Sequence, residues 1–141
     1  EEVGCRGAKV GSYKINPDIA FVVDVTHGIS PYVKETDGFE LESGAAIGVG
    51  PNLHNKLTEK LINIANENKI KHTIEVCAGN SGTDAWPIQI SRSGIPTMLV
   101  SVPIRYMHTS VETANQKDIE AAVDLICTMI ERGDYNAQDA M

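Results

Sequence analysis

Carboxylates and one histidine are the residues of this sequence best suited to chemistry. Glu1 and Glu2 open the sequence, Asp24 lies near the end of an apolar run, and His108 lies six residues beyond the end of another. Carboxylate oxygens and neutral imidazole nitrogens bind Zn²⁺ and similar divalent ions at about 2.0–2.2 Å. A bound ion lowers the pKa of its water to about 7, and a spare carboxylate can accept the proton of that water. These residue types are those of a hydrolytic metal site.

Each of these residues also has an ordinary structural explanation. Glu1 and Glu2 can form a solvated chain end. Asp24 can cap a turn, and His108 can be a hydrogen-bonded structural histidine. Adjacent residues of a regular strand point to opposite faces, so the two glutamates serve one site only if the backbone leaves strand geometry, which Gly4 would ease. The residues alone therefore leave a metal site and purely structural roles both open.

Composition excludes several classes of protein. The 141 residues form one domain at most, and 42% hydrophobic with 22% charged residues is ordinary for a soluble globular protein. A net charge of −7 without a Lys/Arg cluster argues against binding to nucleic acid or an anionic membrane. The apolar runs are far shorter than the ~20 residues that span a bilayer. Three widely spaced cysteines indicate a reducing, cytoplasmic setting.

The pattern of apolar residues predicts an α/β protein. A nearly continuous apolar run, typical of a strand buried on both faces, covers residues 19–25, and further strands are expected at residues 45–49, 73–77 and 97–102. Helical patterns cover residues 5–15, 53–68, a stretch of about ten residues after Asp84, and 119–130. Residues 28–44 are expected to form a loop because they mix Gly, Ser, Pro and acidic residues. We therefore expect part of a mixed, mostly parallel sheet sandwiched between helices.

Local signals predict how two helices begin and where a site forms. Asp84 is placed to cap the helix that follows it, with Pro87 in the first turn. Thr113 and Gln116 have the spacing of a capping box for the closing helix. Ligand sites of α/β sheets form beyond the carboxyl ends of the strands, where loops can bring Asp24 together with the histidine that follows the last strand.

Four segments occur in the order and spacing of one known family. They are EEVGCRGA (1–8), VDVTH (23–27), SGTDA (81–85) and SVPIRYMHT (101–109). The chain resembles the catalytic domain of the tetrahedral, TET-type dinuclear metallo-aminopeptidases. That family includes glutamyl and deblocking aminopeptidases and members labelled cellulase or endoglucanase. The resemblance implies a zinc-exopeptidase-like fold, of which residues 1–141 would be the C-terminal portion of one catalytic domain.

The resemblance implies a role for each candidate residue. Glu1 would be the general base acting on a metal-bridging water. Glu2 and His108 would ligate one divalent ion and Asp24 the other, the ions being Zn²⁺, Co²⁺ or Mn²⁺. Family members add a histidine and a bridging aspartate from upstream sequence. The chain would thus hold three of five ligands, and we expect it to be inactive alone.

Further residues and partners follow from the same resemblance. Asp84, Arg105 and Tyr106 would lie near the substrate, although Asp84 serves equally well as a helix cap and Arg105 in a salt bridge. His27 either orients Asp24 or is merely exposed. Family members carry an inserted β-rich domain, absent from this sequence, and form dodecamers. The parent enzyme is therefore expected to be a cytoplasmic homo-oligomer that acts on peptides.

Three functions compete at this point. The first is two-metal removal of N-terminal residues from peptides. The second is glycoside hydrolysis, which needs two carboxylates about 5–9.5 Å apart and no metal. That chemistry favours an aromatic-lined cleft, and only 5% of the residues are aromatic. The third is a non-catalytic binding or assembly module. Loss of activity on chelation would separate the first function from the second.

Overall fold

A mixed sheet forms the centre of the computed structural model, which describes residues 1–31, 33–133 and 135. Its main strands are β1 (Ala20–His27), β2 (Ala45–Val49), β3 (His72–Val76) and β4 (Thr97–Arg105). They lie in the order β1-β4-β2-β3, and the short β5 (Thr113–Ala114) also pairs with β4. The pairs β1/β4 and β2/β3 are parallel, whereas β2 and β5 run antiparallel to β4. The carboxyl ends of β1 and β4 therefore meet at one edge of the sheet.

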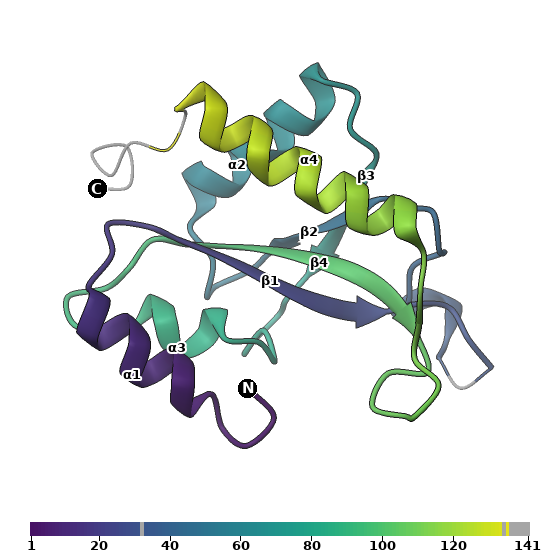
Figure 1. Cartoon of the computed structure of the whole chain (residues 1–141), viewed down its shortest axis with the longest axis horizontal. Coiled ribbons are helices and arrows are strands. Elements are labelled where there is room, and N and C mark those ends of the chain that lie inside the picture. The colour runs from purple at the N-terminus through teal and green to yellow at the C-terminus, as the bar shows by residue number, and fades with distance from the viewer. Residues whose placement is uncertain (32, 134, 136–141) are drawn as a thin grey trace.

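Helices cover both faces of this sheet (Figure 1). Helices α2 (Asn55–Glu67) and α4 (Gln116–Arg132) lie on one face, and α1 (Arg6–Ile15) and α3 (Ala85–Gln89) lie on the other. The structure confirms the expected α/β fold with a mostly parallel sheet between helices. No helix among the residues that the structure describes is long and apolar enough to cross a membrane.

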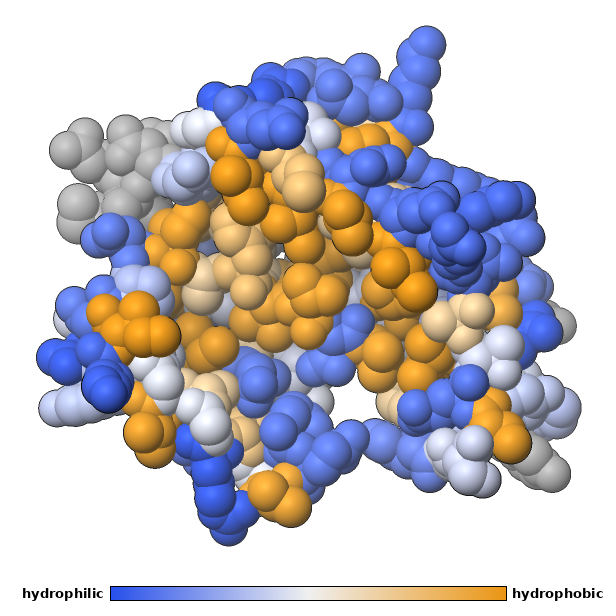
Figure 2. Space-filling view, viewed as in Figure 1, coloured by the Kyte–Doolittle hydropathy of each residue, from blue (hydrophilic) through white to orange (hydrophobic). Residues whose placement is uncertain are grey.

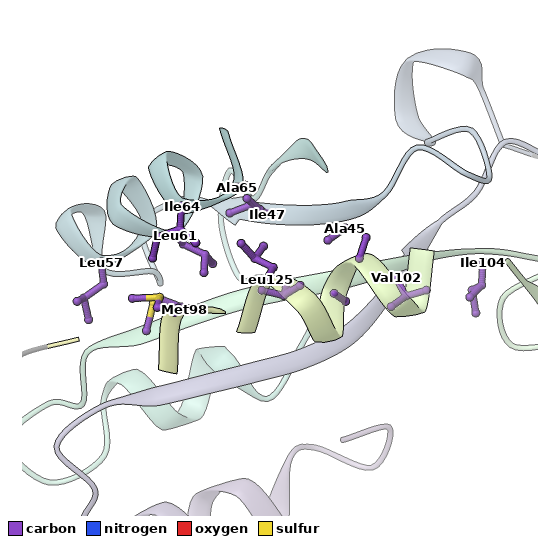
Figure 3. Packing of buried hydrophobic residues seen from close by; sticks show 14 residues of the cluster. Ala45, Ile47, Leu57, Leu61, Ile64, Ala65, Met98, Val102, Ile104 and Leu125 are labelled. Atoms are coloured by element: carbon purple, nitrogen blue, oxygen red, sulfur yellow. The ribbon is translucent and has the colours of Figure 1, made fainter. Parts of the chain in front are cut away.

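Two apolar clusters hold the layers together. In the larger cluster, leucines of α2 and α4 pack against β2 and β4, as Figure 3 shows for Leu57, Leu61 and Leu125. All three are completely buried, and each such burial contributes about 1.5–3 kcal/mol. The smaller cluster lies between the sheet and α3 and includes Val22 and Leu99. Because side chains alternate along a strand, the residues two and four positions after Val22 share its face, the face covered by α1 and α3.

A buried carboxylate fastens the loop before β2 to the start of α4. Asp118 accepts hydrogen bonds from the backbone N–H groups of Glu42 at 2.8 Å and Gly44 at 2.7 Å. Gly44 has a φ of +88°, and a Cβ there would lie 2.0 Å from the carbonyl oxygen of Lys71. Only glycine therefore fits this close approach.

Three local predictions were wrong. The helix after Asp84 has five residues, not about ten, because Arg92 (φ +53°) and Gly94 (φ +100°) turn the backbone away from helical geometry. The side chain of Asp84 does not cap this helix; Thr83 Oγ1 accepts from the N–H of Ala85 instead, at 3.2 Å.

The predicted capping box of the closing helix is also absent. Thr113 belongs to β5, opposite Arg105, and Gln116 donates forward to Glu120 at 2.7 Å. Asn115 caps α4, since its side chain accepts from the N–H of Lys117 at 2.9 Å.

An apolar surface extends over β1 and α4. Val23 of β1 is 58% exposed and Val123 of α4 is 54% exposed, and Val25, Ile119 and Ile130 are exposed as well. Figure 2 shows apolar side chains across the middle of this view, where β1 and α4 lie. We call these five residues the β1/α4 apolar face.

The three cysteines are all free thiols in different environments. Cys5 and Cys77 are buried, whereas Cys127 on α4 is exposed. Burial, with a smaller contribution from Glu75, raises the pKa of Cys77 to about 11.

Candidate active site

The candidate site joins the start of the chain to the turn after β4. His108 Nε2 lies 2.9 Å from Glu2 Oε1, which links residues 106 positions apart in the sequence. Both side chains are largely exposed. The carbonyl of Glu1 accepts from the N–H groups of Gly4 and Cys5, both at 2.8 Å, so this segment is a turn and not a strand. The two adjacent glutamates are thereby freed from the opposite-face constraint of a regular strand.

The turn that carries His108 has a constrained backbone. Tyr106 and His108 have φ values of +60° and +62°, which non-glycine residues rarely adopt. The N–H of His108 donates to Glu112 Oε1 at 2.6 Å, and Thr109 Oγ1 donates to the carbonyl of Tyr106 at 2.6 Å. Glu112 was not among the predicted site residues, because a glutamate in a turn carries no periodic or motif signal.

Asp24 lies on the face of β1 that α1 and α3 cover. It is half-buried between Val22 and Thr26, and its Oδ1 accepts from the N–H of Val25 at 2.8 Å. Burial is the largest cause that raises the pKa of Asp24, and the nearby carboxylates of Asp84 and Glu2 raise it further. The hydrogen bond from Val25 and the N-terminal ammonium oppose this shift. Asp24 is therefore surrounded by an excess of negative charge.

Asp84 adds a partly enclosed carboxylate to the same region. Its Oδ1 is buried and has no hydrogen-bond partner among the residues that the structure describes. The buried thiol of Cys5 is its neighbour: burial first, and then Asp84, raise the pKa of Cys5. Asp84 is thus free of a capping role and near Asp24.

The remaining predicted residues have clear positions. Arg105 is half-buried and pairs with Glu40 at 4.0 Å, which is the salt-bridge alternative raised above. Tyr106 and His27 are exposed. His27 is three residues after Asp24 in β1, so its side chain lies on the opposite face of the strand. Of the two roles considered for His27, its exposed position fits the second, a surface residue.

The donor atoms suit a divalent cation in kind. Glu2 and His108 form an adjacent carboxylate–imidazole pair, and Asp24 and Asp84 add hard oxygen donors nearby. Within residues 1–31, 33–133 and 135, no group of three or more His, Cys, Asp or Glu is close enough to hold a metal ion. The described part of the chain supplies ligands of the right type without completing a coordination sphere.

Comparison with known proteins assigns this chain to a family. A model of the M42 glutamyl aminopeptidases matches residues 1–125. The chain belongs to the M42 glutamyl aminopeptidase family. Its sequence is 37% identical over 131 residues to the lysyl aminopeptidase of Pyrococcus furiosus, covering 93% of this chain and 38% of that protein. M42 members are hydrolases of the metallopeptidase class, so membership implies divalent metal ions.

Solved structures of aminopeptidases and related peptidases share the fold. The structure is similar to that of an aminopeptidase from the archaeon Desulfurococcus kamchatkensis, with a TM-score of 0.86, 32% identity, and coverage of 100% of this chain and 41% of that one. It is also similar to the TET1 peptidase of Pyrococcus horikoshii, which can assemble into a tetrahedron or a large octahedral shell. There the TM-score is 0.73 at 34% identity, covering 92% of this chain and 38% of that one. The chain thus spans about two fifths of the length of these relatives.

Proposed function

We propose that this chain is part of a metal-dependent aminopeptidase that removes N-terminal residues from peptides. The observation that carries the proposal is the contact of Glu2 with His108, which unites two distant segments beside the carboxylate-rich surroundings of Asp24. Family membership supports peptide hydrolysis over glycoside hydrolysis.

The site residues divide into ligands and a base. We assign Glu2 and His108 to one divalent ion and Asp24 to a second. Two such ions polarise a peptide carbonyl and acidify water when bound. We assign Glu1, which is exposed and directly precedes Glu2 in the sequence, as the base that would accept a proton from water and return it to the leaving amine. The remaining ligands would come from sequence outside these 141 residues, since the relatives are more than twice as long.

We assign Asp84, Arg105 and Tyr106 to substrate binding. The negative charge of the partly exposed Asp84 carboxylate suits the positive α-ammonium group of a peptide, and exposed Tyr106 offers an apolar ring to the first side chain. We further propose that the complete enzyme is a cytoplasmic homo-oligomer. The assembled TET1 relative and the three free thiols of this chain support that view.

Asp24→Asn tests this function in the complete enzyme. The amide keeps the shape of the side chain but removes a charged ligand. We expect activity on an aminoacyl chromogenic substrate and the bound metal both to fall, activity by at least about 100-fold. Asp18→Asn, at an exposed carboxylate six residues upstream, is the matched control. A chelator should abolish wild-type activity. Full activity of Asp24→Asn, or of the chelated enzyme, would disprove the metallopeptidase assignment.

A further inference from the structure

The turn between β4 and β5 holds its histidine in an unfavourable backbone conformation. The two strands pair through Ile104 with Ala114 and Arg105 with Thr113, so residues 106–112 must reverse the chain. Two residues of this turn, Tyr106 and His108, have positive φ values. Such left-handed conformations are unfavourable for residues other than glycine and persist only where surrounding contacts enforce them. The turn must therefore contain the contacts that hold it.

Glu112 supplies the contact made to the backbone N–H of His108. Its Oε1 accepts from the N–H of His108 at 2.6 Å, a short bond of the charge-assisted type. Glu112 directly precedes β5, so its backbone is tied to the sheet through the pairing of Thr113 with Arg105. The other bonds within the turn involve Thr109 with Tyr106 and Val111. Glu112 is thus the link between the backbone of His108 and the sheet.

We propose that Glu112 is a positioning residue: by binding the N–H of His108, it fixes the backbone there so that the imidazole Nε2 is directed at Glu2. The inference rests on the proposed function in taking His108 as a metal ligand. It adds a residue that acts on the ligand through the backbone. A ligand held in its binding orientation loses less conformational freedom on binding the ion, which raises affinity.

A positioning role requires a hydrogen-bond acceptor at position 112 and does not require a negative charge there. Glutamine keeps an oxygen acceptor at the same reach, so Glu112→Gln should preserve the bond to His108. Glu112→Ala removes the acceptor, and Glu112→Asp shortens the side chain by one methylene so that it no longer reaches the N–H. If Glu112 instead bound metal through its charge, the glutamine variant would be as poor as the alanine variant.

Metal affinity of the complete enzyme is the decisive measurement. Zn²⁺ dissociation constants are measured by competition with a chromophoric chelator for the wild type, the three Glu112 variants, and Glu131→Ala as an exposed control on α4. We expect Glu112→Ala and Glu112→Asp to bind Zn²⁺ about 10–100-fold more weakly, as for other groups that orient ligands. Glu112→Gln, which keeps the acceptor but not its charge, should bind Zn²⁺ clearly more tightly than Glu112→Ala, and Glu131→Ala should be unchanged.

The possible outcomes test two separate claims, the positioning role of Glu112 and the metal-ligand role of His108. Wild-type affinity of Glu112→Ala overturns the positioning role, as does a glutamine variant as weak as alanine. If Glu112→Ala does not fold, Glu112→Asp replaces it in the same comparison. His108→Ala tests the proposed function separately: if it keeps both Zn²⁺ affinity and activity, His108 is no ligand and the proposed function itself fails. Weak binding by His108→Ala with normal binding by Glu112→Asp overturns the further inference alone.

Discussion

Asp24 is held among like charges, and this has a consequence for stability as well as for metal binding. Its folded-state pKa is raised, chiefly by burial and then by Asp84 and Glu2. A carboxyl group whose pKa is raised on folding stabilises the fold while it is protonated, and this contribution is lost as pH rises through the folded-state pKa. At neutral pH the ionised Asp24 is therefore a destabilising group in the metal-free protein.

The same substitution that removes function should thus stabilise the metal-free protein. We expect Asp24→Asn to raise the melting temperature of the apo protein at pH 7, because a neutral amide costs less to bury than a carboxylate and is not repelled by Asp84 and Glu2. The difference from the wild type should shrink as pH falls through the raised pKa of Asp24, because the carboxyl then becomes protonated. Calorimetry of both proteins with excess chelator measures it. A lower melting temperature for the variant at pH 7 would contradict the electrostatic argument.

At the scale of elements, Asp118 connects the loop before β2 with α4. Asp118→Ala leaves the N–H groups of Glu42 and Gly44 without their acceptor in a buried setting, so we expect a loss of about 2–4 kcal/mol in the free energy of unfolding. Asp124→Ala, at an exposed position of the same helix, should change it by no more than about 0.5 kcal/mol. Urea denaturation measures the free energy of unfolding of both variants. Equal losses for Asp118→Ala and Asp124→Ala would show that the hydrogen bonds to Asp118 contribute nothing to stability.

Most elements could be predicted from sequence because long periodic stretches specify them. Residues 53–68 repeat leucine and isoleucine at helical spacing, and the observed α2 falls inside that range. The failures are short elements governed by contacts distant in sequence. β5 has two residues and exists through its pairing with β4, so Thr113 lost its predicted capping role to strand pairing.

The candidate site was predictable in part for similar reasons. The contact of Glu2 with His108 follows from residue type and from the motifs. The negative charge around Asp24 depends on Asp84, whose position is set by how α3 packs against α1. Glu112 acts through a backbone N–H, for which a sequence holds no signal.

For the whole molecule, the β1/α4 apolar face is the main departure from an ordinary surface. Ile119, Val123 and Ile130 recur at helical spacing, and that pattern predicted the closing helix. Yet α4 buries a neighbouring stripe that includes Ala122, Leu125 and Met129. The exposed stripe and the valines of β1 together form an apolar area of a kind that monomeric soluble proteins seldom expose.

An isolated 141-residue chain should therefore show its apolar face in solution. We expect it to bind an environment-sensitive apolar dye and to self-associate in sedimentation. The double variant Val23→Thr/Val123→Lys should lower both dye binding and self-association, since these two residues are the most exposed of the face. Val76→Thr, an exposed valine of β3 outside it, is the control and should leave them unchanged. Equal dye binding by the wild type, the double variant and Val76→Thr would show that the dye binds outside the β1/α4 apolar face.

The contrast among the three thiols gives the molecule a built-in attachment point. Maleimides react with thiolates, and near pH 7 the buried Cys77, with a pKa of about 11, is almost entirely protonated, while Cys5 is shielded by burial and by Asp84. Cys127 is open to solvent on α4. A fluorophore or spin label therefore attaches there without any cysteine being removed. Its signal would report, from a known position on α4, when another molecule binds over that helix.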